Sequence, residues 1–139
     1  SKSAYKMYVV QGKLLIKTYP VVFGFNEKDD KIREGDGCTP EGVFRLRSKY
    51  GHNKWSKFIW IDYPNQASWQ KFNAAKQAGI IPEKATIGGE VGIHGVPDNK
   101  DYWIDNRENW TLGCISMKNK DVDELYQAIS TETILEVRK

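Results

Sequence analysis

Short runs of β-branched, aromatic and aliphatic side chains dominate the first 63 residues, and they restrict the fold more than any other feature of the chain. Residues 5–25 are rich in Val, Ile, Leu and Tyr, and Gly12 interrupts them as a hairpin turn does. In residues 42–50 apolar and basic side chains alternate, which is typical of a half-buried strand. Residues 57–63 form a further run with a continuous apolar centre. We therefore expect a mainly β protein.

Two later segments have the periodicity of helices. In residues 66–78 large apolar side chains recur at helical spacing, and Gly79 supplies a stop signal. In residues 121–130 apolar side chains line one face, and Asn119 or Asp121 is the expected N-terminal cap. We therefore expect a few short helices beside the strands.

The chain has the size and composition of one domain. Its 139 residues are 40% hydrophobic, which suffices for one core, and no repeat or linker divides them. We expect residues 1–139 to form a single domain and a monomer. No apolar stretch approaches the roughly 20 residues that span a bilayer, so we expect no membrane contact from this domain. Residues 1–10 also lack the features of a signal peptide.

Charge and metal-ligating residues argue against several function classes. The net charge is +3 and the lysines are scattered, so we expect no nucleic-acid partner. The soft ligands Cys38, Cys114, His52 and His94 lack the compact spacing of a zinc site, and we expect no metal. Two cysteines do not make a disulfide framework, although a bond between them stays open.

Cys114 lies behind a glycine in the segment TLGCISM, and it is either a small buried residue or a nucleophile. A nucleophilic thiol needs a neighbour that lowers its pKa from about 8.5, usually a histidine that takes the proton. His94 ends a strand-like segment, which is a more rigid position than the polar loop expected around His52. The predicted site therefore has the His94 imidazole within hydrogen-bond reach of the Cys114 sulfur.

Two glycines extend this predicted site. The carbonyl of Gly95 follows the histidine and could orient its ring, the role that a side-chain amide or carboxylate has in other cysteine enzymes. The N–H groups of Gly113 and Cys114 could together stabilise the oxyanion of a tetrahedral intermediate. Each signal alone is weak, and a buried cysteine with an unrelated histidine remains the alternative.

Three stretches of the chain resemble the L,D-transpeptidase (YkuD-type) catalytic domains of bacterial cell-wall metabolism. They occur in the order of that family and extend from about Val9 to the C-terminus. The first contains a strand, a glycine, a loop and a Thr-Pro-x-Gly motif, the second is GIHG, and the third is TLGCISM followed by NKDVDELY. The matching residues are Gly24, Thr39, Pro40, Gly42, Phe44, His94, Gly95, Gly113 and Cys114.

The resemblance implies a YkuD-like β-sandwich with a few short helices and a cleft at one end. It implies that Cys114 is the nucleophile, His94 the base and Gly95 the source of the ring-orienting carbonyl. The implied substrate is the peptide stem of peptidoglycan, in the cell envelope, without metal or organic cofactor. The thiolate attacks the carbonyl of the third stem residue, expels the terminal D-amino acid, and passes the acyl group to an amine or to water.

Two departures from the family pattern leave the outcome of the reaction open. Leu112 stands where most members carry a second histidine, and Ser116 stands where many carry Arg or Asn. The chain thus resembles a subset without the second motif histidine, some of whose relatives hydrolyse. The alternatives are a hydrolase on the same scaffold (an L,D-carboxypeptidase or endopeptidase, or an enzyme that releases wall-attached protein) and a non-enzymatic wall-binding module. We expect Thr111 and Ser116 to contact substrate.

The segment 98–110 separates the predicted base from the nucleophile. Either its aromatic residues Tyr102, Trp103 and Trp110 wall the cleft as a lid, or they anchor a solvent-exposed flap. In the first case its acidic side chains could meet the amine of an incoming stem; these are Asp98, Asp101, Asp105 and Glu108. Cys38 has no role in the family pattern, and we expect a loop thiol there.

Overall fold

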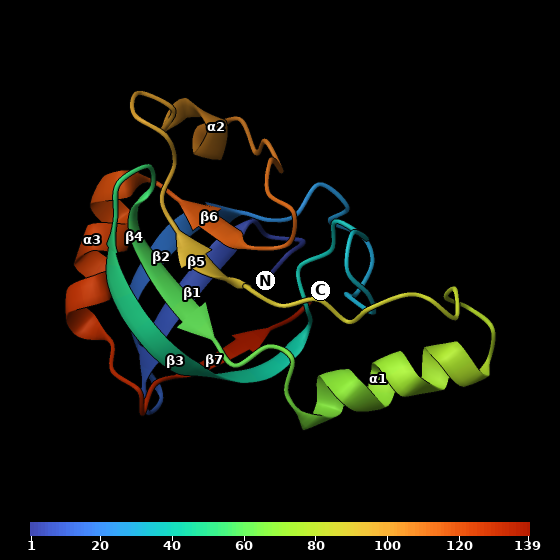
Figure 1. Ribbon diagram of the computed structural model, residues 1–139. Coiled ribbons are helices and arrows are strands. Elements are labelled where there is room, and N and C mark those ends of the chain that lie inside the picture. The colour runs from blue at the N-terminus through green and yellow to red at the C-terminus, as the bar shows by residue number, and fades with distance from the viewer.

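The computed structural model describes residues 1–139, and seven strands form one curled sheet (Figure 1). The strand order is β1-β2-β6-β5-β4-β3-β7. The strands are β1 (Lys6–Gln11), β2 (Leu14–Val22), β3 (Gly42–His52), β4 (Ser56–Ile61), β5 (Gly92–His94), β6 (Ile115–Met117) and β7 (Ile134–Val137). The mainly β, YkuD-like fold predicted from the sequence is confirmed, and its strands share one mixed sheet.

The only parallel neighbours in the sheet are β5 and β6, and they lie at its centre. All other neighbouring strands pair antiparallel. In the β5–β6 ladder His94 lies opposite Ser116. Because β6 begins directly after Cys114, this pairing brings Cys114 close to the strand that ends in His94.

Three helices accompany the sheet: α1 (Gln66–Gln77), α2 (Tyr102–Asp105) and α3 (Asn119–Ala128). A capping box between Asn65 and Ser68 starts α1, which extends away from the sheet as an arm (Figure 1). Both predicted long helices are present, but the predicted caps of the second were wrong. Lys118 is the N-cap of α3 without a side-chain bond, and the Asn119 side chain instead accepts from the Val96 N–H at 2.9 Å.

Twenty buried residues form one hydrophobic core cluster beneath the curled sheet. The central strands contribute Ile59, Ile61 and Met117, and α3 adds Val122 and Leu125. Burial of these apolar surfaces is the main stabilising term, and it fixes the short strands β5 and β6 in the interior.

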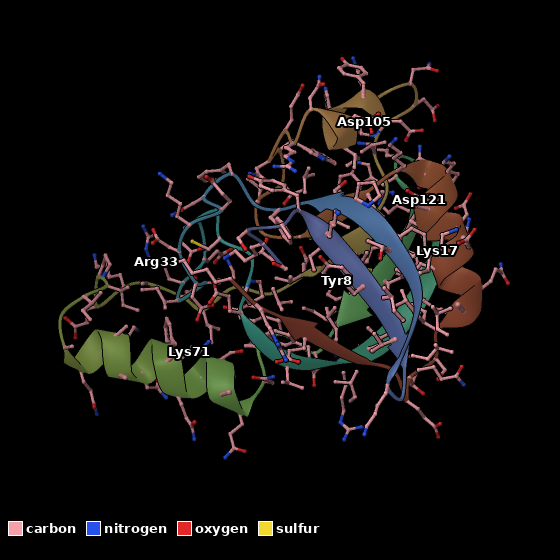
Figure 2. All side chains as sticks on the ribbon, turned by 180° about the vertical axis from the view of Figure 1, so that it is seen from behind. Tyr8, Lys17, Arg33, Lys71, Asp105 and Asp121 are labelled. Carbon is pink, nitrogen blue, oxygen red and sulfur yellow. The ribbon has the colours of Figure 1, made fainter.

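The outer face of the β1–β2 hairpin is exposed. Figure 2 shows Tyr8 and Lys17 on this hairpin, seen from behind. Several apolar side chains of the hairpin are also exposed, namely Val10, Leu14, Leu15 and Ile16. None of the helices has both the length and the apolar character required to cross a membrane.

Candidate active site

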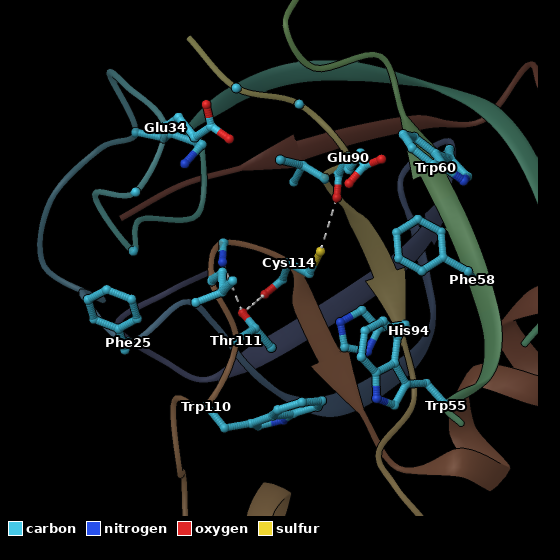
Figure 3. Close-up of a pocket in the computed structure, with 18 of the residues that line it drawn as sticks. Phe25, Glu34, Trp55, Phe58, Trp60, Glu90, His94, Trp110, Thr111 and Cys114 are labelled. Carbon is cyan, nitrogen blue, oxygen red and sulfur yellow. Dashed lines mark hydrogen bonds between the residues drawn. The ribbon is translucent and has the colours of Figure 1, made fainter. Parts of the chain in front are cut away.

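A cavity of about 770 Å³ opens beside the central parallel strands, and both His94 and Cys114 line it (Figure 3). Trp110, Thr111 and Gly113 complete its wall around the cysteine. The sheet therefore brings together the two side chains that the sequence predicted to act as a pair. The geometry between them differs from the predicted one.

The turn that carries Cys114 is held against the loop of the Thr-Pro motif. Gly113 has a φ of +151°, and a Cβ there would lie 2.8 Å from the carbonyl oxygen of Cys38. Only glycine fits such a conformation at such a close approach. On the other side of the loop, the Thr39 hydroxyl accepts the Gly24 N–H at 2.9 Å, and Gly24 pairs with Thr111. The loop of the Thr-Pro motif thus packs against the turn that carries Cys114 and supports it.

Thr111 organises the same turn from within. Its hydroxyl donates to the Cys114 carbonyl at 2.6 Å and accepts the Gly113 N–H at 3.2 Å. The Gly113 N–H, predicted as half of an oxyanion site, is therefore already bound in this structure. The Thr111 hydroxyl is likewise occupied by backbone groups, which differs from the substrate contact predicted for it.

His94 is 2% exposed and sits among three aromatic rings. Its ring stacks on Trp55 at 4.3 Å and on Phe58 at 5.7 Å between centroids, and Trp110 meets it edge-on at 5.4 Å. Burial in this apolar surrounding lowers the pKa of His94 to about 4, against the opposing effect of its hydrogen bond to Gly95. The imidazole is consequently neutral at pH 7.

The carbonyl of Gly95 fixes the tautomer of that neutral ring. It lies 2.7 Å from Nδ1 of His94, and because a carbonyl only accepts, Nδ1 carries the proton. Nε2 is then free to accept a proton. A Cβ on residue 95 would collide with the Asn119 side chain and the Trp55 carbonyl, so the backbone here requires glycine.

Ser116 is 0% exposed and lies behind the histidine. Its hydroxyl donates to the Gly95 carbonyl at 3.0 Å, which gives that oxygen a second donor besides the imidazole. Ser116 does not line the cavity, so this structure gives no support to the substrate contact predicted for it. Its place is in the support of the ring-orienting carbonyl.

Cys114 is half-buried, and its thiol donates to the Glu90 carbonyl at 3.6 Å (Figure 3). The predicted hydrogen bond to His94 is not formed in this structure. Burial raises the pKa of the thiol to about 11, although the Gly92 N–H and the Lys31 ammonium act in the opposite direction. The resting pair is thus a neutral thiol and a neutral imidazole, instead of the thiolate and imidazolium expected from the sequence.

Comparison with known families identifies the architecture. A model of the YkuD family, described as the L,D-transpeptidase catalytic domain, matches residues 1–137. The chain belongs to this family. No curated protein sequence matches it.

Several solved structures share the fold of this L,D-transpeptidase family member at low sequence identity. The helical cell shape determining protein Pgp2 from Campylobacter jejuni is 22% identical with a TM-score of 0.68, over 99% of this chain and 46% of that one. Bd1075 from Bdellovibrio bacteriovorus is 18% identical with a TM-score of 0.65, over 98% and 45%. The catalytic domain of the Enterococcus faecium L,D-transpeptidase is 16% identical with a TM-score of 0.58, over 96% and 89%. The chain spans less than half the length of the first two.

Residues 98–110, before the turn that carries Cys114, contribute one aromatic residue to the cavity of this L,D-transpeptidase domain. Trp110 lines the cavity, whereas Tyr102 and Trp103 do not, and the Trp103 ring packs on Trp110 with 5.2 Å between the ring centroids. The acidic residues of the segment are also outside the lining. Asp101 accepts the Asn119 N–H and Asp105 pairs with Lys118, so both stabilise the start of α3.

Sequence reasoning missed most of the other residues that line the cavity, among them four that lie close to the predicted pair or its turn. Trp55 and Phe58 enclose His94, Lys31 lies beside Gly113, and the Glu90 carbonyl binds the thiol. His52 was expected in a loop, yet it ends β3 and stacks on Trp55 at 4.6 Å. The closely spaced aromatic residues of the β3–β4 hairpin were the sequence signal that could have pointed to Trp55 and Phe58. No three His, Cys, Asp or Glu side chains gather as a metal site would require.

Proposed function

We propose that this domain is a cysteine acyltransferase that acts on peptidoglycan stem peptides in the cell envelope. One observation carries the proposal: His94 at the end of β5 and Cys114 in the turn before β6 face the same cavity, and the Gly95 carbonyl holds the imidazole with Nε2 unprotonated. A neutral imidazole with a fixed acceptor nitrogen is suited to take the thiol proton.

The first step moves one proton and forms one bond. The Cys114 thiol leaves the Glu90 carbonyl, turns toward His94, and transfers its proton to Nε2 while the sulfur attacks the carbonyl carbon of the third stem residue. Because the Gly113 N–H is bound to Thr111, we assign the stabilisation of the oxyanion to the Cys114 N–H. The C–N bond then breaks, and the imidazolium returns its proton to the departing D-amino acid.

The second step uses the same base. Neutral His94 takes a proton from the amine of a second stem as that amine attacks the thioester carbonyl. The C–S bond then breaks, and the imidazolium returns its proton to the sulfur, which restores the thiol. Since the three aromatic rings keep the imidazolium out of water, the charged form is high in energy and short-lived. Proton transfer is therefore concerted with attack in this mechanism.

Purified tetrapeptide stems test the proposal, with intact-mass and product analysis as the readouts. Wild type should release the terminal D-amino acid and join two stems, and an acyl adduct should map to Cys114. Cys114→Ser and His94→Gln should remain folded and lose turnover. A wild-type protein that neither forms an adduct nor releases the D-amino acid would contradict the proposal.

A hydrolytic outcome on the same site is the second candidate, and Leu112 favours it. This side chain is 79% exposed beside the nucleophile turn, where it offers no second base to an acceptor amine. Water would then attack the thioester with help from His94 alone. Free tripeptide without cross-linked dimer in the same assay would identify the hydrolase, and dimer without tripeptide would exclude it.

A further inference from the structure

The turn end of the β1–β2 hairpin is apolar on both faces of the ribbon. Leu14, Leu15 and Ile16 follow one another in β2 and are each more than half exposed, as is Val10 in β1. Because successive strand residues point to opposite faces, both faces of the ribbon lie in solvent here. Figure 2 shows the hairpin from its open side, with its turn at the end of the molecule opposite α2. We call residues 10–16 the hairpin tip.

The hairpin tip takes no part in the reaction proposed above. None of its residues lines the cavity that contains His94 and Cys114. The hairpin contributes to the hydrophobic core through other side chains, among them Tyr19 and Val21. Single exposed apolar residues are common on protein surfaces, whereas several that lie together mark an interaction site. The tip is therefore a candidate contact surface that neither the fold nor the reaction explains.

The charged side chains of the hairpin are all positive. Residues 6–22 contain Lys6, Lys13 and Lys17 and no acidic residue. Lys17 pairs with Glu124 of α3 at 3.0 Å, whereas Lys6 and Lys13 join no ion pair. The ammonium of Lys13, in the turn itself, is thus a free positive charge at the tip. A partner that matches this surface is apolar where it meets the tip and anionic around it.

The order of side chains along the hairpin matches the layers of a bilayer surface. The two cross-strand rows beside the turn contain Val10, Leu14 and Leu15 with one glutamine, and they extend over about 7 to 10 Å. The next two rows contain Lys17 and Tyr8. This spacing suits apolar rows at the boundary of the acyl chains, with lysine and tyrosine at the level of the headgroups. The long stem of the lysine in the turn lets its ammonium reach that level too.

We propose that the hairpin tip binds the surface of a bilayer that contains anionic phospholipids. The acyl boundary of a bilayer is liquid and surrounds both faces of the tip, whereas a protein groove would cover one face of the ribbon. A second copy of the chain would bring a second set of lysines against the first, which like-charge repulsion disfavours. The sequence predicts no membrane contact because no segment could span a bilayer, but a surface contact needs only exposed apolar and basic side chains. Since no tip residue lines the cavity, the bound domain keeps its cavity open to substrate.

Co-sedimentation of the whole chain with lipid vesicles tests the inference. One set of vesicles is phosphatidylcholine alone, and the other contains phosphatidylcholine and phosphatidylglycerol in equal parts. Wild type should bind the anionic vesicles about 10-fold or more tightly than the neutral ones, because lysines near an anionic surface are attracted to it. This binding should weaken at high salt, which screens the attraction.

Two variants of the hairpin tip separate its apolar contact from its charge. Ile16→Ser and Lys13→Glu should each weaken binding to the anionic vesicles by about 10-fold or more. Ile80→Ser and Lys84→Glu, which change exposed residues of the segment after α1, are the matched controls and should bind as wild type does. None of the four residues lines the cavity, so all four variants should keep stem-peptide turnover within about 3-fold of wild type.

Several results would overturn the inference. Wild type would bind neutral and anionic vesicles equally, or the control variants would lose as much binding as the hairpin variants. A dimer in solution that Ile16→Ser dissociates would make the tip a contact between copies. Binding to polyglutamate that Ile16→Ser weakens as much as it weakens vesicle binding would indicate an acidic protein partner instead. The comparison of the two vesicle types uses wild type alone, so it holds even if a variant fails to fold. Lack of stem-peptide turnover in wild type would overturn the proposed function and leave this inference unchanged.

Discussion

The two cysteines of the chain differ in what surrounds them more than in their acidity. Burial raises the pKa of both thiols to about 11. Cys38 is 1% exposed and its thiol donates to the Asp36 carbonyl at 3.5 Å, in the loop of the Thr-Pro motif. Cys114 faces an open cavity that it shares with His94. Access to a cavity and a neighbouring imidazole therefore distinguish Cys114 from Cys38, and resting acidity does not.

The two regions nevertheless depend on each other. The carbonyl of Cys38 lies against Gly113, and Thr39 holds the Gly24 segment that pairs with Thr111. The loop of the first cysteine is thus the support of the turn that presents the second. Variants in the Cys38 loop and in the Cys114 turn therefore distinguish the chemical role of the turn from its structural support.

Exchange of each cysteine gives the largest expected contrast. We expect Cys114→Ser to lower kcat by about 10⁴-fold or more, because the serine hydroxyl is a far weaker nucleophile beside a neutral imidazole. Cys38→Ser should keep turnover within about 3-fold of wild type and lower only the melting temperature. Stem-peptide turnover and thermal unfolding measure the two effects. Comparable turnover losses in both variants would remove the distinction between the two sites.

The sequence predicted the elements of the fold that depend on local pattern. The alternation in the first half predicted the strands, and apolar spacing predicted α1 and α3 within a few residues. The pairing of His94 and Cys114 around one cavity was also predicted, because short motifs limit where a base and a nucleophile can lie.

Predictions failed where the deciding contacts are distant in sequence. Ser116 is directed at the Gly95 carbonyl by the β5–β6 register, which no local pattern reveals. The low pKa of His94 arises from Trp55 and Phe58, whose hairpin lies some forty residues away. The side-chain oxygen of Asn119 accepts the Val96 N–H because α3 begins against the segment that follows β5, so a residue of cap type does not cap the helix.

The pH dependence of stability tests whether burial keeps the His94 ring neutral. The pKa of His94 is about 4 in the folded state and near 6.5 when unfolded, so the unfolded chain binds more protons between these values. Stability conferred by the neutral ring is present above pH 6.5 and is lost as the pH falls toward 4, by about 3 kcal/mol. Urea unfolding at several pH values should show this slope in wild type and its absence in His94→Gln. Parallel curves for the two proteins would contradict the assignment.

Gly113→Ala tests the contact between the two cysteine regions directly. The new Cβ would meet the Cys38 carbonyl at 2.8 Å in a backbone conformation that disfavours side chains. We expect the free energy of unfolding to fall by about 2 to 3 kcal/mol, with a loss of turnover because the turn must shift. Gly12→Ala is the matched control, since Gly12 also has a positive φ but open space around its Cβ position, and should cost about 1 kcal/mol. Equal costs for both variants would mean that the close approach is unimportant.

Thr39→Val gives the smallest expected effect, and it asks whether the supporting loop acts through one hydrogen bond. Thr39 is 0% exposed, and valine would preserve its volume while leaving the buried Gly24 N–H without its acceptor at 2.9 Å. We expect a loss of about 1 to 2 kcal/mol in the free energy of unfolding, and a lower kcat because Gly24 pairs with Thr111 in the nucleophile turn. Thr39→Ser keeps the acceptor and should retain kcat despite a small packing loss. If valine and serine lower kcat equally, the loop supports the turn through packing alone, and the hydrogen bond between Thr39 and Gly24 has no separate part in placing Cys114.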